Sequence, residues 1–379
     1  MNKLFKEFFE SEKAGGLILI VATIISLIIS NTSLGAGYLD FWHTKIGSHS
    51  LGHWINDGLM AIFFLLIGLE LEREIYKGEL SNIKDASLPI FAALGGMLVP
   101  AGLFLVFNYG TENQAGAGIP MATDIAFALG VLSLLGNRVP VALKIFLTAL
   151  AVIDDLGAIL IIAFFYTKTL LFTNLFIALG TFALLLVLNR LKVRNLLVYL
   201  AGGIVMWYFM LNSGVHATIT GVLLAFAIPF GKGDEKSPSY ILQHILHKPV
   251  AFIILPLFAL ANTAIILSSD IGEVLTENYS LGIATGLIVG KPLGVFFMSY
   301  LAVSLGISKL SNGLTWKSIF GVGLLAGIGF TMSIFITLLA FDNDLIINNA
   351  KLVILLASLV SGILGFIVLK MTLKKEVEQ

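Results

Sequence analysis

Residues 141–166 read VALKIFLTALAVIDDLGAILIIAFFY, an apolar run long enough to cross a membrane once, with two adjacent carboxylates, Asp154 and Asp155, at its middle. An ionisable side chain at the centre of a bilayer costs at least about 2.5 kcal/mol, so it needs a compensating role. Thr123 and Asp124 lie inside the preceding apolar run, and Lys291 lies inside a later one. The sequence therefore predicts a functional site within the membrane, and moving ions or protons is the simplest role for it.

The composition of the chain sets its class. Of the 379 residues, 58% are hydrophobic and 12% are charged, against roughly 25% charged in soluble domains. One globule cannot bury this much apolar surface, so we predict an all-α integral membrane protein. The net charge is zero, which argues against nucleic acid as a partner. The chain has no cysteine, which excludes disulfides, thiolate metal sites and cysteine nucleophiles.

Apolar runs predict about 12 transmembrane helices, at 14–31, 57–75, 86–107, 115–136, 141–166, 170–189, 196–211, 214–230, 249–268, 281–305, 318–341 and 349–369. Twelve crossings put both termini on one side, together with nearly all the lysines and arginines between the runs. The opposite side has only Lys45, Lys168 and Lys351. Because loops rich in lysine and arginine stay in the cytoplasm, we expect both termini to be cytoplasmic.

Two alternatives concern the N-terminal part. The first run could be a cleaved signal peptide, but acidic residues among the first twelve favour a retained helix. The segment from Gly35 to His53 contains His43 and His49 as well, and these three histidines could suggest a metal site. Their spacing matches no ligand pattern, so we favour a glycine-rich outer loop or small hairpin.

The buried charges share one layer of the membrane. Asp124 and Asp154 lie at similar distances from Arg138, about 20 Å along their helices, and Lys291 reaches a similar depth. Successive helical residues point about 100° apart, so Asp154 and Asp155 cannot face the same space. For Asp154, a structural salt bridge with Lys291 and a role in transport are about equally good interpretations. One lysine cannot neutralise three carboxylates, so Asp155 is expected to bind a proton or a cation.

The backbone around Asp124 is as informative as the acid. The segment GAGIPMATD at 116–124 places two glycines and a proline inside an apolar run, and 321–329 repeats such a break with four glycines. Paired interruptions of this kind point to a transporter site between two repeats. In the run at 281–305, glycine recurs every fourth residue from Gly282 to Gly294, which predicts a smooth face for close packing beside Lys291.

These motifs resemble the NhaA-type sodium/proton antiporters nearly from end to end. The matching strings are ATDIAFALG (122–130), IDDLGA (153–158), GKPLG (290–294), GIGFTMSIFI (327–336), NDGLMAIFFLLIGLE (56–70), GVHAT (214–218) and LPLFALAN (255–262). The resemblance implies an NhaA-like fold, in which two inverted three-helix repeats carry two crossing discontinuous helices.

The resemblance also implies a division of the chain. Core transport helices would lie at 86–168 and 281–373. Panel helices at the dimer interface would lie at 1–85 and 169–280, with the outer hairpin near 35–53, and 374–379 would be a cytoplasmic tail. The protein would be a homodimer in the lipid bilayer of the bacterial inner membrane.

The resemblance implies a role for each buried polar residue. Asp154 and Asp155 would bind Na⁺ or Li⁺ and protons, with Asp124 and Thr123 supporting the site. Asp124 would offset the half-helix N-termini, and Lys291 would offset the C-termini or carry a proton. Two protons would move inward for each Na⁺ exported, without any cofactor.

The candidates for pH sensing are Glu70, Glu74, His216 and Asp57, with Arg73 and Lys77 nearby. Gln243 stands where the family pattern has an acidic residue, so the pH set-point is open. His216 is about equally well explained as an interfacial histidine.

Three rival classes remain. Two buried aspartates could form a protease dyad, but the Asp154–Asp155 doublet and Lys291 have no place in a dyad, and we predict that the protein is not an enzyme. A passive channel would need rings of polar residues around a symmetric pore. A cation-coupled symporter of a small organic anion is the strongest alternative, although the core offers no additional basic residue for an anion.

Overall fold

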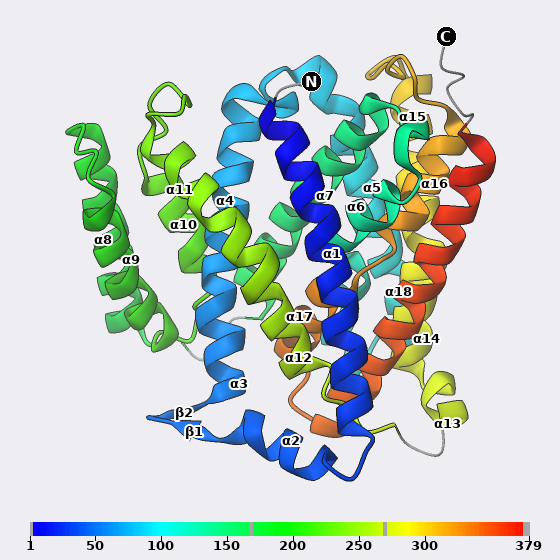
Figure 1. Ribbon diagram of the computed structural model, residues 1–379, viewed down its shortest axis with the longest axis horizontal. Coiled ribbons are helices and arrows are strands. Elements are labelled where there is room, and N and C mark those ends of the chain that lie inside the picture. The colour runs from blue at the N-terminus through cyan, green and yellow to red at the C-terminus, as the bar shows by residue number, and fades with distance from the viewer. Residues whose placement is uncertain (1–2, 167–169, 268–270, 374–379) are drawn as a thin grey trace.

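The computed structural model describes residues 3–166, 170–267 and 271–373, and this part is a bundle of helices with one short β-hairpin (Figure 1). The tail expected at 374–379 lies outside the described residues. Eight helices are long and apolar enough to cross a membrane, or up to ten such spans exist if each bent pair counts as one. The all-α membrane class is therefore confirmed, while twelve crossings remain a prediction.

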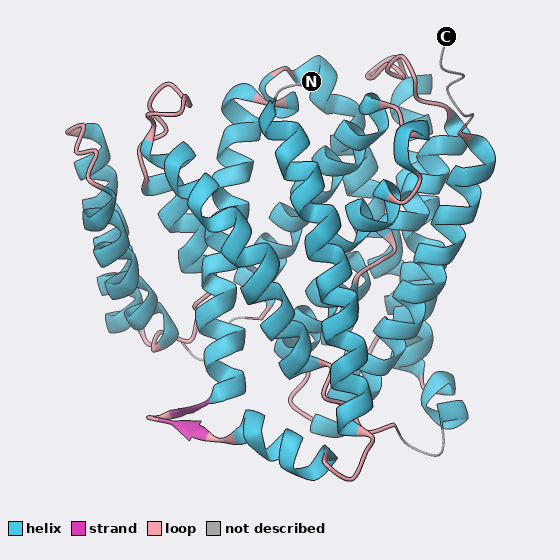
Figure 2. Ribbon diagram, in the orientation of Figure 1, coloured by secondary structure: helices cyan, strands magenta, loops and turns pink. Residues whose placement is uncertain are grey.

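Helices dominate both halves of the bundle, as the colouring by secondary structure makes plain (Figure 2). The expected panel consists of α1 (Lys3–Ser30), α2 (Gly35–His43), β1 (Lys45–Ile46), β2 (His49–Ser50), α3 (Leu51–His53), the π-helical turn η1 (Trp54–Leu59), α4 (Met60–Lys77), η2 (Glu79–Ser81), α8 (Phe172–Arg190), α9 (Leu196–Leu211), α10 (Ile219–Ala227), α11 (Pro238–Pro249), η5 (Val250–Ile254), α12 (Leu255–Asn262) and α13 (Ile271–Thr276).

The expected core has the same order of elements twice, a continuous helix, a broken helix and a second continuous helix. Its elements are α5 (Ile83–Asn108), η3 (Glu112–Met121), α6 (Ile125–Ser133), η4 (Gly136–Arg138), α7 (Val141–Phe165), α14 (Asn278–Thr285), η6 (Gly286–Gly290), α15 (Lys291–Ser304), α16 (Trp316–Ala326), α17 (Phe330–Ala340) and α18 (Asp344–Thr372). The inverted relation between the two sets stays a prediction.

The segment at 35–53 folds as a bent helix and a hairpin. The chain turns by 115° between α1 and α2, and β1 then pairs with β2 in antiparallel fashion. Gly47 has a φ of +69°, a left-handed conformation that glycine adopts without a steric penalty, and it allows the tight turn. This hairpin lies at the opposite end of the bundle from the start of α1 (Figure 1).

Two apolar runs fold differently from their expected bounds. In the run at 214–230, only α10 with nine residues is α-helical, since Gly214 has a φ of +89° in the turn before it. In place of the run expected at 249–268, the structure has a span that begins earlier, at Pro238, and ends earlier, at Asn262. The first part of this span, α11, contains too many polar residues to be recognised as an apolar run. Pro249 ends α11 and is accommodated because the helix continues as the wider π-helical turn η5.

The glycine face of α14, η6 and α15 packs closely against α5, as predicted. A Cβ added at Gly282 would contact Phe104, one at Gly290 would contact Pro100, and Gly95 and Gly294 lie backbone to backbone. This contact brings Lys291, which begins α15, beside the first broken helix. The lysine side chain is fully buried.

The close contact at Gly95 makes a prediction about stability. The Gly95→Ala substitution should lower the apparent melting temperature in detergent, because its Cβ would meet the backbone of α15, and such overpacking costs about 1–3 kcal/mol. Gly102→Ala is the matched control on the same helix, because a Cβ there meets nothing within 4 Å. Equal melting temperatures for the two variants would contradict the packing described here.

Candidate functional site

The two helix breaks meet each other. Residues 122–124 separate η3 from α6, and residues 327–329 separate α16 from α17, with a bend of 48°. The backbone N–H of Asp124 donates to the carbonyl of Ile328 over 2.7 Å, so the two breaks are joined directly. Because a bilayer offers no water to exposed backbone groups, such breaks are stable only when other groups satisfy them.

Asp124 binds the N-termini of both half-helices. Its Oδ1 accepts the N–H of Phe127 (2.9 Å) in α6, and its Oδ2 accepts the N–H of Thr331 (3.1 Å) in α17. The hydroxyl of Thr331 donates to the same Oδ2 over 2.5 Å. A carboxylate is favourable at a helix N-terminus because it bonds unpaired N–H groups and offsets the helix dipole. One aspartate therefore does this for two helices.

Lys291 and Thr123 contact the C-terminal ends of the other two half-helices, η3 and α16. The Lys291 ammonium donates to the carbonyl of Met121, at the end of η3, and to Oδ2 of Asp154 over 2.7 Å. The Thr123 hydroxyl lies 2.7 Å from the same Asp154 oxygen and 2.9 Å from the carbonyl of Ala326, at the end of α16. The Asp154–Lys291 salt bridge is thus present, and it is fully buried.

Asp155 faces a different space, as the helical rotation predicts. Neither carboxylate oxygen of Asp155 has a hydrogen-bond partner within the described part of the chain, and Asp155 is only 1% exposed. It lines a cavity of about 30 Å³ together with Asp124, Thr331, Glu70 and His247. A cavity of this size holds one or two water molecules. An unpartnered buried carboxylate is a strong acceptor for a proton or a hard cation.

The electrostatics around Asp155 are dominated by negative charge. Asp154, Asp124 and Glu70 act on it as like charges, and Lys291 acts as the opposite charge. Lys291 already contacts Asp154, so the cavity carries an excess of carboxylates over cations. This arrangement favours exchange between protons and a cation.

The acids of α4 lie toward the end of the bundle where α1 begins. Glu70 is buried, and its Oε1 lies 4.0 Å from Nδ1 of His247 in α11. Glu74 acts on Glu70 as a like charge one helical turn further along. Sequence reasoning missed His247 as well as Glu72, which is 4% exposed with one oxygen lacking a partner among the described residues. No local pattern distinguishes these two from surface residues.

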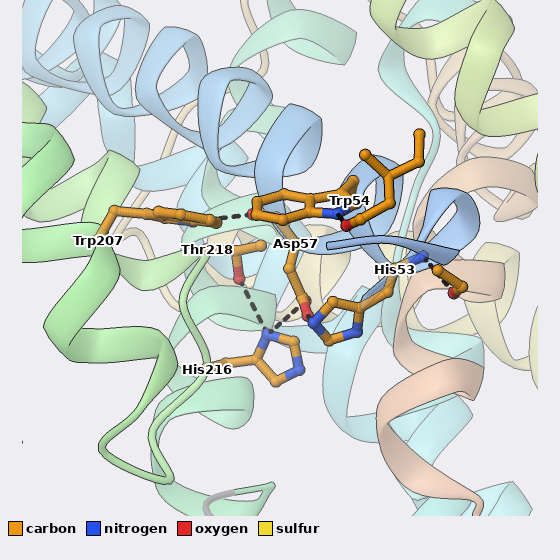
Figure 3. Close-up of polar contacts among 8 residues, drawn as sticks. His53, Trp54, Asp57, Trp207, His216 and Thr218 are labelled. Atoms are coloured by element: carbon orange, nitrogen blue, oxygen red, sulfur yellow. Dashed lines mark hydrogen bonds and ion pairs between the residues drawn. The ribbon is translucent and has the colours of Figure 1, made fainter. Parts of the chain in front are cut away.

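A second polar cluster lies at the end of the bundle near the hairpin. Oδ2 of Asp57 lies 3.2 Å from Nε2 of His53, and its Oδ1 lies 3.7 Å from Nδ1 of His216, which comes from the loop before α10 (Figure 3). The Trp207 indole donates to the carbonyl of Asp57 over 3.1 Å. The structure thus joins two predicted pH-sensing residues, Asp57 and His216, away from the Asp155 cavity.

This second polar cluster borders a cavity of about 600 Å³, much larger than the cavity at Asp155. Its lining includes Lys351, which the sequence suggests as a loop residue but which is 8% exposed within α18. Phe335 of α17 lines this cavity too, and it packs on Phe64 and Phe258.

The histidines of the hairpin region do not form a metal site. His49 and His53 stack with ring centroids 4.1 Å apart and an interplanar angle of 20°. Among the residues that the structure describes, no group of three or more His, Cys, Asp or Glu side chains could hold a metal ion.

Comparison with known proteins gives a consistent result over nearly the whole chain. The family described as Na⁺/H⁺ antiporter 1 matches residues 6–369. A Na⁺/H⁺ antiporter NhaA of Flavobacterium psychrophilum is 73% identical over 374 residues, which cover 99% of this chain and 97% of that protein. The NhaA 1 of Flavobacterium johnsoniae is 63% identical over 98% of this chain and 97% of its own, and the NhaA of Cytophaga hutchinsonii is 60% identical over 99% and 97%. With its apolar spans, its paired helix breaks and these relatives, this chain belongs to the Na⁺/H⁺ antiporter 1 family of transmembrane ion transporters.

Proposed function

We propose that this protein is an electrogenic antiporter that exports Na⁺ or Li⁺ across the bacterial inner membrane in exchange for inward protons. The observation that carries the proposal is the pair of unpartnered oxygens on Asp155, in a cavity shared with Asp124 and Glu70. Both termini are cytoplasmic in this proposal, which the distribution of basic residues supports. The protein works as a homodimer in the bilayer, without a cofactor.

Exchange follows from competition for the same oxygens. Na⁺ and Li⁺ are hard cations that prefer oxygen ligands, and a carboxylate binds either a cation or a proton. Among the residues that the structure describes, Asp155 has two oxygens without a partner and Asp154 has one, because the other oxygen of Asp154 contacts Lys291 and Thr123. Asp155 is therefore the primary ligand of the cation. Asp154 becomes a second ligand when the salt bridge between Asp154 and Lys291 breaks.

Alternating access requires the site to open to each side in turn. The core at 86–168 and 281–373 moves against the panel at 1–85 and 169–280. The packing of Phe335 on Phe64 supports an outer side that is closed in this conformation. Two protons enter for each Na⁺ that leaves, so one net positive charge moves inward and the membrane potential contributes about 2.3 kcal/mol per 100 mV.

Control by pH involves the charged groups on the routes to the site. Glu70 and Glu74 lie on the route at one end, and Asp57 and His216 on the route at the other. Histidine changes its charge near neutral pH, which supports His216 as one of these groups. The Gln243 amide hydrogen-bonds Glu70, so a neutral group takes the place of an acid there.

The alternative, symport of a small organic anion, has weaker support. The cavity at Asp155 is about 30 Å³, too small for an organic anion, and its one neighbouring lysine is bonded to Asp154. A protease dyad is disfavoured because Asp124 and Asp154 each have separate partners and share no proton.

The first test is proton flux in proteoliposomes of purified protein, followed with a trapped pH-sensitive dye. Na⁺ or Li⁺ should move protons, and K⁺ or choline should not. Asp155→Asn should reduce the flux at least about a hundredfold, equivalent to about 2.7 kcal/mol, because the amide cannot exchange a proton for a cation. Asp234→Asn, the same change on an exposed loop, should leave it intact. Flux that persists in Asp155→Asn would refute the assignment.

Thr123 should affect affinity and not the exchange itself. Thr123→Ala should raise the KM for Na⁺ about two- to tenfold, because it removes one donor to Asp154, with the maximal rate retained. Thr123→Ser should restore the wild-type KM. If Thr123→Ala abolished exchange as completely as Asp155→Asn, the two residues would not have separate roles.

The stoichiometry has its own test. At zero membrane potential, a 2:1 exchanger stops when the Na⁺ concentration ratio equals the square of the proton ratio. Imposed gradients should therefore produce no net flux at this ratio, and a potential that drives positive charge inward should restart Na⁺ export. If net flux instead stopped when the Na⁺ ratio equals the proton ratio, and if the membrane potential did not change this point, the exchange would be electroneutral.

A further inference from the structure

The second helix break carries a threonine that sequence reasoning did not assign to the site. Thr331 is the second residue of α17, and it is 2% exposed. Both its hydroxyl and its N–H donate to Oδ2 of Asp124, over 2.5 and 3.1 Å. Thr331 and Asp124 also line the cavity that contains Asp155. A single threonine therefore connects the second broken helix to an acid of the first.

The three aspartates differ in how many of their oxygens are occupied. Both oxygens of Asp124 accept hydrogen bonds, and three donors point at them. Asp155 has none, and Asp154 has one free oxygen, within the described residues. Two of the donors to Asp124 are backbone N–H groups, which only a change to proline would remove. The Thr331 hydroxyl is the donor through which a side-chain change can act on Asp124.

This hydroxyl is one of the three donors that together hold the Asp124 carboxylate in its direction. The residue before α17, Gly329, has no side chain to cap the helix, and the Phe330 N–H is bonded by the Ser358 hydroxyl of α18. Asp124 replaces the missing N-cap side chain by accepting the N–H of Thr331. Without the hydroxyl, Oδ2 would keep one weaker bond and could turn toward the cavity. Hydrogen bonds to an ionised group are about twice as strong as neutral ones.

We infer that Thr331 is a positioning residue for cation exchange, whose hydroxyl holds Asp124 as the fixed negative charge of the site. Protons and cations are then exchanged at Asp155 and not at Asp124. This inference rests on the antiport proposed above. Thr123 does the corresponding work at the first break, where its hydroxyl contacts Asp154, so each break supplies one threonine to one aspartate.

Loss of the hydroxyl should change the competition between protons and cations. Asp124 would lose one of its three donors, and its carboxylate would be held less firmly in its present direction. The titratable groups that face it across the cavity are Asp155, Glu70 and His247, with Asp154 and Lys291 behind them. An Asp124 carboxylate that is displaced from this direction supplies less negative potential at Asp155, which weakens Na⁺ binding in competition with protons, so a higher pH is needed for the same Na⁺ occupancy. At saturating Na⁺ and high pH, the maximal rate should be unchanged.

The test compares three variants in proteoliposomes across a range of pH. Thr331→Val, which keeps the shape and removes the hydroxyl, should raise the KM for Na⁺ about tenfold, or about 1.4 kcal/mol, and move the pH profile upward by about one unit. Thr331→Ser should restore both. Thr337→Val is the matched control, because its hydroxyl is equally buried in α17 but bonds the carbonyl of Ser333 in its own helix over 2.8 Å.

A double-mutant comparison separates positioning from general damage. Li⁺ binding to purified protein is measured by calorimetry for Thr331→Val, Asp124→Asn and the double variant. If Thr331 acts through Asp124, Thr331→Val should add no further loss in the Asp124→Asn background. Equal losses in both backgrounds, or failure of Thr331→Ser to restore the pH profile, would overturn the inference.

The remaining outcomes are also decisive. An unchanged KM and pH profile in Thr331→Val would refute the role of Thr331 while leaving antiport intact, provided that the wild-type protein exchanges Na⁺ for protons. Absence of exchange in the wild type would instead refute the proposed function. If Thr331→Val does not fold, Thr331→Ala replaces it, and an unfolded alanine variant would show a structural role and overturn the inference.

Discussion

The crossing of two broken helices is the constraint on which the rest of this structure depends. Each break leaves backbone N–H and C=O groups without helical partners in a region that holds no bulk water. Asp124 takes the free N–H groups of two half-helices, while Lys291 and Thr123 take free carbonyls. These polar residues therefore satisfy backbone groups at the crossing, and the charged ones place charge in the middle of the membrane.

Asp155 shows how such a frame becomes a functional site. Asp124 is bonded at the crossing and Asp154 is bonded to Lys291, whereas no described residue bonds the oxygens of Asp155. A carboxylate that is held by its surroundings cannot easily exchange its partner, and one without partners can. In the proposed mechanism, the division between fixed and exchangeable carboxylate oxygens therefore follows from hydrogen bonding, although all three residues are aspartates at similar depth.

Small residues position the frame. Gly95 and Gly294 let α5 and α15 approach until their backbones touch, which brings Lys291 to the end of η3. The π-helical turn η6 lies directly before Lys291, and another, η1, contains Asp57. Such turns often accompany functional sites, since they change the direction of the helix and free backbone groups. The carbonyl of Asp57 is one such group, and it binds Trp207.

The sequence by itself determined the membrane class, the two helix breaks, the glycine face and the opposite orientations of Asp154 and Asp155, because these follow from burial cost and local helix geometry. It did not reveal that Thr331 binds Asp124, that His247 approaches Glu70 or that His216 meets Asp57. Nor did it indicate that the ninth run begins as early as Pro238. Contacts between distant segments depend on how helices pack and rotate against one another, and only the tertiary structure decided them.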